Sequence, residues 1–174
     1  MEPFRPQRAL GIVDDSTVRA AQRGDPRALD ELIRQVAPYV GRICGAIALQ
    51  DGEDAMQEAL MAIARGVTSL REPQAFKSWV RRIAVREAIH MTQRRRPTDP
   101  YDETAAASDV DLAVVVDVRS VLTRLSPAQR AILVLRDLDG YSEREVGQLL
   151  DIPEGTVKSR LHRARGAFVR RWQQ

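Results

Sequence analysis

The sequence predicts an all-α protein in which a flexible acidic linker joins two small helical domains. Apolar residues recur at helical spacing through most of its 174 residues, and no two segments pair convincingly as strands. Between the helical stretches, residues 97–115 carry five acidic and no basic side chains, with prolines and small residues that cannot bury a core. We therefore expect an N-terminal extension at 1–14, a first domain at 15–96, a linker at 97–115 and a second domain at 116–174.

The first domain is expected to open with two helices separated by a turn. Asp15-Ser16 can cap a short helix to Arg23, and Gly24-Asp25-Pro26 can end it and start a longer one with Pro26 at its first position. Pro38 is expected to kink or split this second helix, because proline lacks the amide hydrogen that continues the ladder. Its buried face comprises Leu29, Leu32, Ile33, Val36, Val40, Ile43 and Ile47, with Cys44 beside it as a small apolar core residue.

After Gln50-Asp51-Gly52 a third helix is expected to run to about Arg65, burying Met56, Ala59, Leu60 and Ile63. Its exposed face combines acidic groups with a methionine. Such a combination is typical of a surface that docks a protein, and an acidic metal site is the alternative. The acidic residues of this region do not share one helix face, which argues against the metal site. The docking face comprises Asp54, Gln57, Glu58 and Met61.

Residues 67–74 are predicted to form a loop, followed by a fourth helix from about Ala75 to Arg96. This helix interleaves buried Phe76, Trp79, Val80, Ile83 and Ala84 with the cations Lys77, Arg81, Arg82, Arg86 and the run 94–96. Basic residues among aromatic ones can hold a single nucleic-acid strand by phosphate contacts and base stacking. The alternative is that aromatic residues at helical spacing are simply core, and Trp79 is expected to be mostly core.

The second domain is expected to contain four helices. Val114, Val118, Val121, Leu122 and Leu125 recur at helical spacing, and Ser126-Pro127 caps a further helix that Gly140 ends. Residues 112–118 could instead form a strand, but no partner strand is apparent.

The last two helices have the pattern of a helix-turn-helix. Ser142 and Glu145 form a capping box that starts a helix at Glu143, and Asp151-Ile152-Pro153 breaks it. A second helix begins near Glu154 and buries Val157, Leu161, Ala164 and Phe168. Its opposite face carries Lys158, Ser159, His162 and Arg163, with Arg165 at the edge. This helix is therefore free to enter a DNA major groove, whereas a merely solvated basic face is the alternative.

Other function classes find little support in the residues. No nucleophile and base lie in a catalytic pattern, so we expect no enzyme, no cofactor and no small-molecule substrate. Cys44 is the single cysteine and His90 is far from His162, so a metal site with His162 as ligand is disfavoured. No leader segment or membrane-length apolar run is apparent, and we expect a cytoplasmic protein without membrane insertion.

From about Thr17 to Trp172 the chain resembles a bacterial sigma factor of the extracytoplasmic-function type. The stretch LSPAQRAILVLRDLDGYSEREVGQLLDIPEGTVKSRLHRAR is similar to the family's region 4. GDPRALDELI, EDAMQEAL and FKSWVRRIA follow the order and spacing of its region 2. The resemblance implies a protein that is not an enzyme and that supplies promoter specificity to core RNA polymerase.

The resemblance also implies a role for each surface. The helix 154–171 would read the −35 element through Thr156, Lys158, Ser159, His162, Arg163 and Arg165. The loop 67–74 and the helix after it would open and read the −10 element through Thr68, Ser69, Arg71, Lys77, Trp79, Arg81, Arg82 and Arg86. Asp54, Gln57, Glu58 and Met61 would dock on the clamp helices of the polymerase β′ subunit. The implied partners are core polymerase, including its β flap, promoter DNA as duplex and single strand, and an anti-sigma factor.

The chain departs from the family pattern at four positions. Arg86 and His90 stand where members commonly have Asn and Asp, Ala64 replaces an aromatic residue, and Pro153 replaces the usual Ser at the cap of the recognition helix. The alternative function is a stand-alone helix-turn-helix regulator that senses a signal through its N-terminal bundle and binds duplex DNA alone. The docking face beside the basic aromatic helix argues against this alternative.

Overall fold

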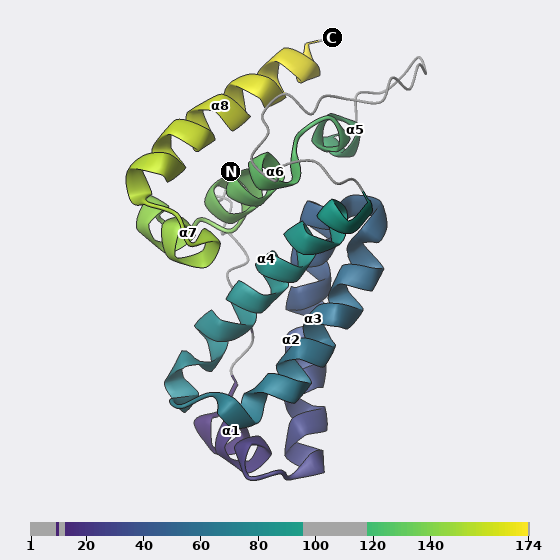
Figure 1. Cartoon of the computed structure of the whole chain (residues 1–174), viewed down its shortest axis with the longest axis vertical. Helices are drawn as coiled ribbons and strands as arrows, with labels where there is room; N and C mark the ends of the chain where they lie inside the picture. The colour runs from purple at the N-terminus through teal and green to yellow at the C-terminus, as the bar shows by residue number, and fades with distance from the viewer. Residues whose placement is uncertain (1–9, 11–12, 96–117, 174) are drawn as a thin grey trace, which may run out of the picture. The chain divides into compact units, whose positions relative to one another are not determined.

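The computed structural model of the chain describes residues 10, 13–95 and 118–173. Every regular element in these residues is helical, which confirms the predicted fold class (Figure 1). The chain divides into two compact units, with the boundary between Met91 and Thr92. The predicted linker 97–115 lies outside the described residues, as does the alternative strand except for Val118, which begins a helix.

The first unit begins with α1 (Asp15–Gln22) and α2 (Pro26–Ala48). Asp25 caps α2 as predicted, because its carboxylate accepts hydrogen bonds from the backbone amides of Arg27 at 2.9 Å and Ala28 at 3.4 Å. The cap of α1 was expected at Asp15-Ser16, which is after the observed N-cap. The N-cap is Asp14, whose carboxylate accepts a hydrogen bond from the Ser16 hydroxyl, and this bond lowers the pKa of Asp14.

The helix α2 forms the centre of this unit and runs unbroken through Pro38, so of the two expected effects of Pro38 the split does not occur and the kink stays a prediction. Its fully buried residues are Leu32, Val36, Val40, Ile43, Cys44 and Ile47, whereas Leu29 and Ile33 are only half-buried. After the turn η1 (Leu49–Asp51), α3 (Gly52–Gly66) packs against α2. A Cβ on Gly52 would lie 2.7 Å from the Gly45 Cα, so glycine permits this close approach.

The segment between α3 and α4 (Phe76–Arg95) is more ordered than the predicted loop. It forms two 3-10 turns, η2 (Val67–Ser69) and η3 (Pro73–Ala75), because buried Val67 and Pro73 attach both to the core. In α4, Phe76 is buried and Trp79 is half-buried, as expected, with their ring centroids 6.1 Å apart.

The second unit contains α5 (Val118–Thr123), α6 (Pro127–Leu133), η4 (Val134–Leu138), α7 (Glu143–Leu150) and α8 (Glu154–Trp172). This arrangement confirms the expected four-helix domain, and Ser126 with Gln129 caps α6 through a capping box. One expectation was wrong. The predicted single helix changes at Val134 into the π-helical turn η4, which rotates the residues after it relative to a continuous α-helix.

Candidate nucleic-acid and protein interfaces

The turn between α7 and α8 is fixed by local hydrogen bonds. The Glu145 carboxylate accepts from the Ser142 backbone amide at 2.7 Å, which confirms the predicted capping box. Asp151 ends α7 in the left-handed conformation with φ of 55°, and the Ile152 amide donates to the Gly147 carbonyl at 3.0 Å. Pro153 precedes α8 without a side-chain capping bond. The backbone therefore sets the direction of α8.

The helix α8 has one buried and one exposed face. Val157, Leu161 and Ala164 are buried as predicted, whereas Phe168 is half-buried and stacks on Trp172 at a centroid distance of 6.0 Å. The residues predicted to face DNA all lie on this helix. Lys158, Ser159, His162, Arg163 and Arg165 are exposed and Thr156 is half-buried. The arrangement presents a basic surface that can enter a DNA groove.

Two cations of this surface have acidic partners that the sequence did not indicate. The Lys158 ammonium lies 3.7 Å from a carboxylate oxygen of Glu143 and 3.6 Å from one of Glu154. Arg165 donates to both oxygens of Asp137, from Nε at 3.0 Å and from Nη2 at 2.5 Å. The hydrogen bonds to Asp137 raise the pKa of Arg165. Asp137 lies in η4, whose π-helical geometry the helical period did not predict.

The predicted docking face lies along α3. Asp54, Gln57 and Met61 are exposed, with Met61 at 45%, and Glu58 is half-buried. Residues three, four and seven positions apart share one side of a helix, so these four side chains form one continuous patch. Within the described part of the chain, no group of three or more His, Cys, Asp or Glu residues could hold a metal ion.

The residues predicted to contact the −10 element come from consecutive parts of the first unit. Thr68, Ser69 and Arg71 are exposed on the segment before α4, and the Ser69 hydroxyl donates to the Gly66 carbonyl at 2.8 Å. On α4, Arg82 and Arg86 are exposed, whereas Lys77, Trp79 and Arg81 are half-buried. The structure thus joins a polar turn to a basic helix.

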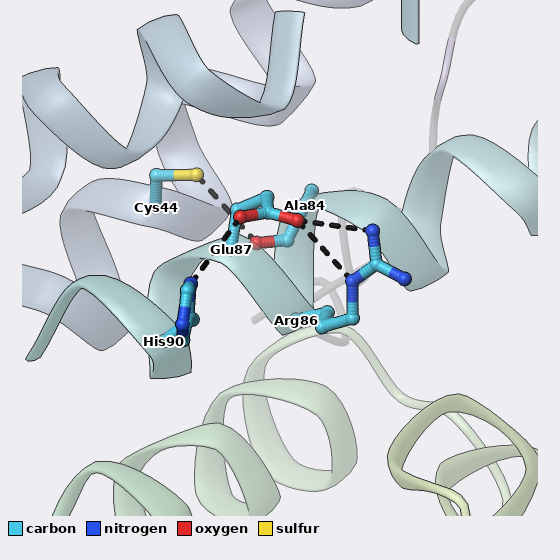
Figure 2. Close-up of polar contacts among 5 residues, drawn as sticks. All are labelled: Cys44, Ala84, Arg86, Glu87 and His90. Carbon is cyan, nitrogen blue, oxygen red and sulfur yellow. Dashed lines mark hydrogen bonds and ion pairs between the residues drawn. The ribbon is translucent and has the colours of Figure 1, made fainter. Parts of the chain in front are cut away.

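Figure 2 shows a carboxylate on α4 that the sequence did not single out. Glu87 accepts hydrogen bonds from Arg86 Nε at 3.2 Å and Nη2 at 3.0 Å, and His90 Nδ1 lies 3.8 Å from its other oxygen. The same carboxylate is near buried Cys44, whose thiol donates to the Ala84 carbonyl at 3.7 Å. Burial, and then the charge of Glu87, raise the pKa of Cys44 to about 12.

Fold and surfaces together define a helical DNA-binding protein with a helix-turn-helix in its second unit. Comparison with protein families gives two matches, Sigma-70 region 2 over residues 29–98 and Sigma-70 region 4 over residues 116–168. A similar protein is the ECF RNA polymerase sigma factor SigM of Mycobacterium tuberculosis, which is 32% identical over 90% of this chain and 83% of its own length. The ECF RNA polymerase sigma-E factor of Escherichia coli is 31% identical over 90% of this chain and 93% of its own length.

These matches show that the chain belongs to the extracytoplasmic-function sigma factors, which direct promoter-specific transcription initiation by RNA polymerase. The fold is also that of the solved structure of CnrH in complex with the cytosolic domain of CnrY, with a TM-score of 0.63 and 22% identity over 90% of this chain and 94% of that one. The sigma factor RpoE of Bartonella quintana, solved with the anti-sigma factor NepR, has a TM-score of 0.62 and is 21% identical over 83% of this chain and 96% of that one.

Among the described helices, none has both the length and the apolar character to cross a bilayer.

Proposed function

We propose that three surfaces of this sigma factor have different roles in transcription initiation, namely reading the −35 element, docking on the polymerase and opening the −10 element. The exposed face of α8 reads the −35 element as duplex DNA. The observation that supports this role is the contrast between the two faces of one helix, since Val157 and Leu161 are buried while Lys158, His162 and Arg163 face outward. A side chain such as Arg163 can donate two hydrogen bonds to a guanine edge in the major groove.

The docking face on α3 binds the clamp helices of the polymerase β′ subunit in this proposal. Asp54 and Glu58 supply negative charge, and Met61 supplies an exposed, adaptable apolar contact. Charge complementarity of this kind sets the orientation and rate of docking. The β flap would contact the second unit.

The segment 67–74 and α4 open the duplex at the −10 element and hold one strand. Extruding a base costs a few kcal/mol, which contacts to the extruded nucleotide must offset. Thr68, Ser69 and Arg71 supply donors, while Arg82 and Arg86 supply charge for the phosphates. The half-buried Trp79 offers one ring edge to the last paired base. A purely structural connector is the competing role for residues 67–74.

The remaining parts of the proposal concern partners and place of action. An anti-sigma factor regulates the protein, which the complex of RpoE with the anti-sigma factor NepR supports. The protein acts in the cytoplasm and leaves the chemistry to the polymerase. Residues 15–96 and 116–174 work as separate domains on either side of the acidic linker 97–115.

Run-off transcription with purified core polymerase tests the proposal as a whole. We expect specific transcripts only when core and this protein are both present, whereas a stand-alone regulator would bind duplex DNA and yield none.

Replacing residues 67–74 by a Gly/Ser linker tests the opening role. Polymerase and −35 binding should persist, and permanganate-detectable melting at −10 should be lost. Melting that persists with the same base preference would assign residues 67–74 to a connector.

A further inference from the structure

The segment between α3 and α4 is attached to a helix that precedes both in the chain. The Leu70 carbonyl, between η2 and η3, accepts a hydrogen bond from the Gln22 side-chain amide at 2.5 Å. Gln22 is the last residue of α1 and is half-buried, and α1 packs against both turns. The contact therefore links positions 48 residues apart in the sequence.

Local hydrogen bonds close the two turns, and the bond from Gln22 adds a long-range contact between them. The Leu70 amide donates to the Val67 carbonyl within η2, and the Ala75 amide donates to Glu72 within η3. Between the two turns Leu70 is extended, with φ of −70° and ψ of 120°, and the chain bends at Arg71. The exposed residues Ser69 and Arg71 flank this position. The bond from Gln22 fixes the Leu70 carbonyl, from which the chain continues to exposed Arg71, whereas Ser69 is also held by its hydroxyl bond to the Gly66 carbonyl.

We propose that Gln22 is a positioning residue for promoter opening, because it fixes the backbone from which the −10 contacts project. The inference rests on the proposed role of residues 67–74. A segment held in its binding conformation loses less conformational entropy when it captures an extruded base. Gln22 itself does not touch DNA in this mechanism. Its loss weakens opening while leaving core binding and −35 binding unchanged.

Two substitutions of similar shape remove the donor. Gln22→Met keeps the side-chain length without an amide, and Gln22→Glu turns a carboxylate, which only accepts, toward the Leu70 carbonyl. Gln35→Met is the matched control, because the Gln35 amide donates to a Glu31 carboxylate oxygen at 2.7 Å on α2. The control removes a glutamine side-chain hydrogen bond from the same unit, in this case one to a carboxylate on the same helix, away from residues 67–74.

The assay is permanganate reactivity at the −10 element of a promoter that the wild-type holoenzyme opens. Loss of one hydrogen bond changes an equilibrium by about two- to tenfold, so Gln22→Met should lower opening by about that factor and Gln22→Glu by more. Gln35→Met should match wild type. Hydrogen exchange of the full chain gives a second readout: in Gln22→Met, amides of residues 67–75 should exchange faster while α3 and α4 keep their protection.

Wild-type opening by Gln22→Glu, with unchanged exchange at 67–75, would overturn the inference. Equal loss of opening in Gln35→Met would also overturn it, since the effect would then reflect general stability. If Gln22→Glu does not fold, Gln22→Met decides the question through the same two measurements. The Gly/Ser replacement of residues 67–74 distinguishes a failure of the proposed opening role from a failure of the positioning role of Gln22. Persistent melting in that variant refutes the proposed role of 67–74, whereas lost melting there with normal Gln22 variants refutes only the positioning role.

Discussion

The substitution Gly147→Ala should destabilise the helix-turn-helix, although it replaces glycine inside a helix by the best helix former. A Cβ at Gly147 would lie 2.7 Å from the Ile152 carbonyl oxygen, which belongs to the backbone of the turn. The gain in helix propensity is about 1 kcal/mol. Moving packed backbone costs about 1–3 kcal/mol, so the net loss should be up to about 2 kcal/mol. The turn must open, which also tilts α8 away from its position.

Gly155→Ala is the matched control in the first turn of α8. A Cβ at Gly155 meets no heavy atom within 4 Å, so this change should stabilise the domain by about 0.5–1 kcal/mol. Thermal unfolding of the full chain, followed by circular dichroism, compares the two variants. A difference of 1 kcal/mol shifts the midpoint of a small domain by about 4–8 °C, and Gly147→Ala should be the lower. Equal midpoints, or a higher one for Gly147→Ala, would refute the steric argument.

Three further substitutions or measurements test the surfaces and the core. Glu58→Lys should weaken binding to core polymerase by on the order of 2 kcal/mol in a pull-down titration, and wild-type affinity would remove Glu58 from the docking face. Arg163→Ala should cost about 1–3 kcal/mol in gel shifts with −35 variants if it reads a guanine, and unchanged affinity for every variant would exclude a contact. The Cys44 thiol, with its pKa raised from 9.0 to about 12, should react with a thiol reagent only as fast as the protein unfolds. The pKa of Cys44 is higher in the folded than in the unfolded protein, so the free energy of unfolding should fall as the pH rises from about 9 toward 12. Rapid labelling of Cys44 at pH 8 would contradict its burial.

Much of the fold followed from the sequence because its signals are local. A capping box needs only a hydroxyl and a carboxylate or amide three residues apart, so the starts of α6 and α7 were predictable from Ser126 and Ser142. The buried stripe of α8 depends only on the helical period, and Val157 and Leu161 are buried accordingly. The cap at Asp25 is equally local.

Features that depend on distant or irregular geometry could not be predicted in this way. The period of 3.6 residues does not indicate a π-helical turn, so the partner of Arg165 at Asp137 was missed. Likewise, nothing near Leu70 in the sequence indicates its bond to Gln22, because the two residues meet only after the helices pack. The polar residues of 67–74 therefore predicted a loop, and the contacts of this segment with α1 were not predicted.

The ion pairs change how the basic surfaces should act on DNA. Lys158, Arg165 and Arg86 all have carboxylate partners within 4 Å in the protein itself. A phosphate that approaches such a cation must compete with the carboxylate or share the cation with it, so each contact adds less attraction than an isolated cation would. The same pairs restrict these side chains to fewer orientations, which reduces the entropy lost on binding. Since salt dependence reports the phosphates neutralised, its slope should be smaller than the number of cations on α4 and α8 suggests. If α4 and α8 bind DNA as proposed, specificity should depend on the orientation of these side chains more than on net charge, and Glu87 and Asp137 should contribute by orienting Arg86 and Arg165.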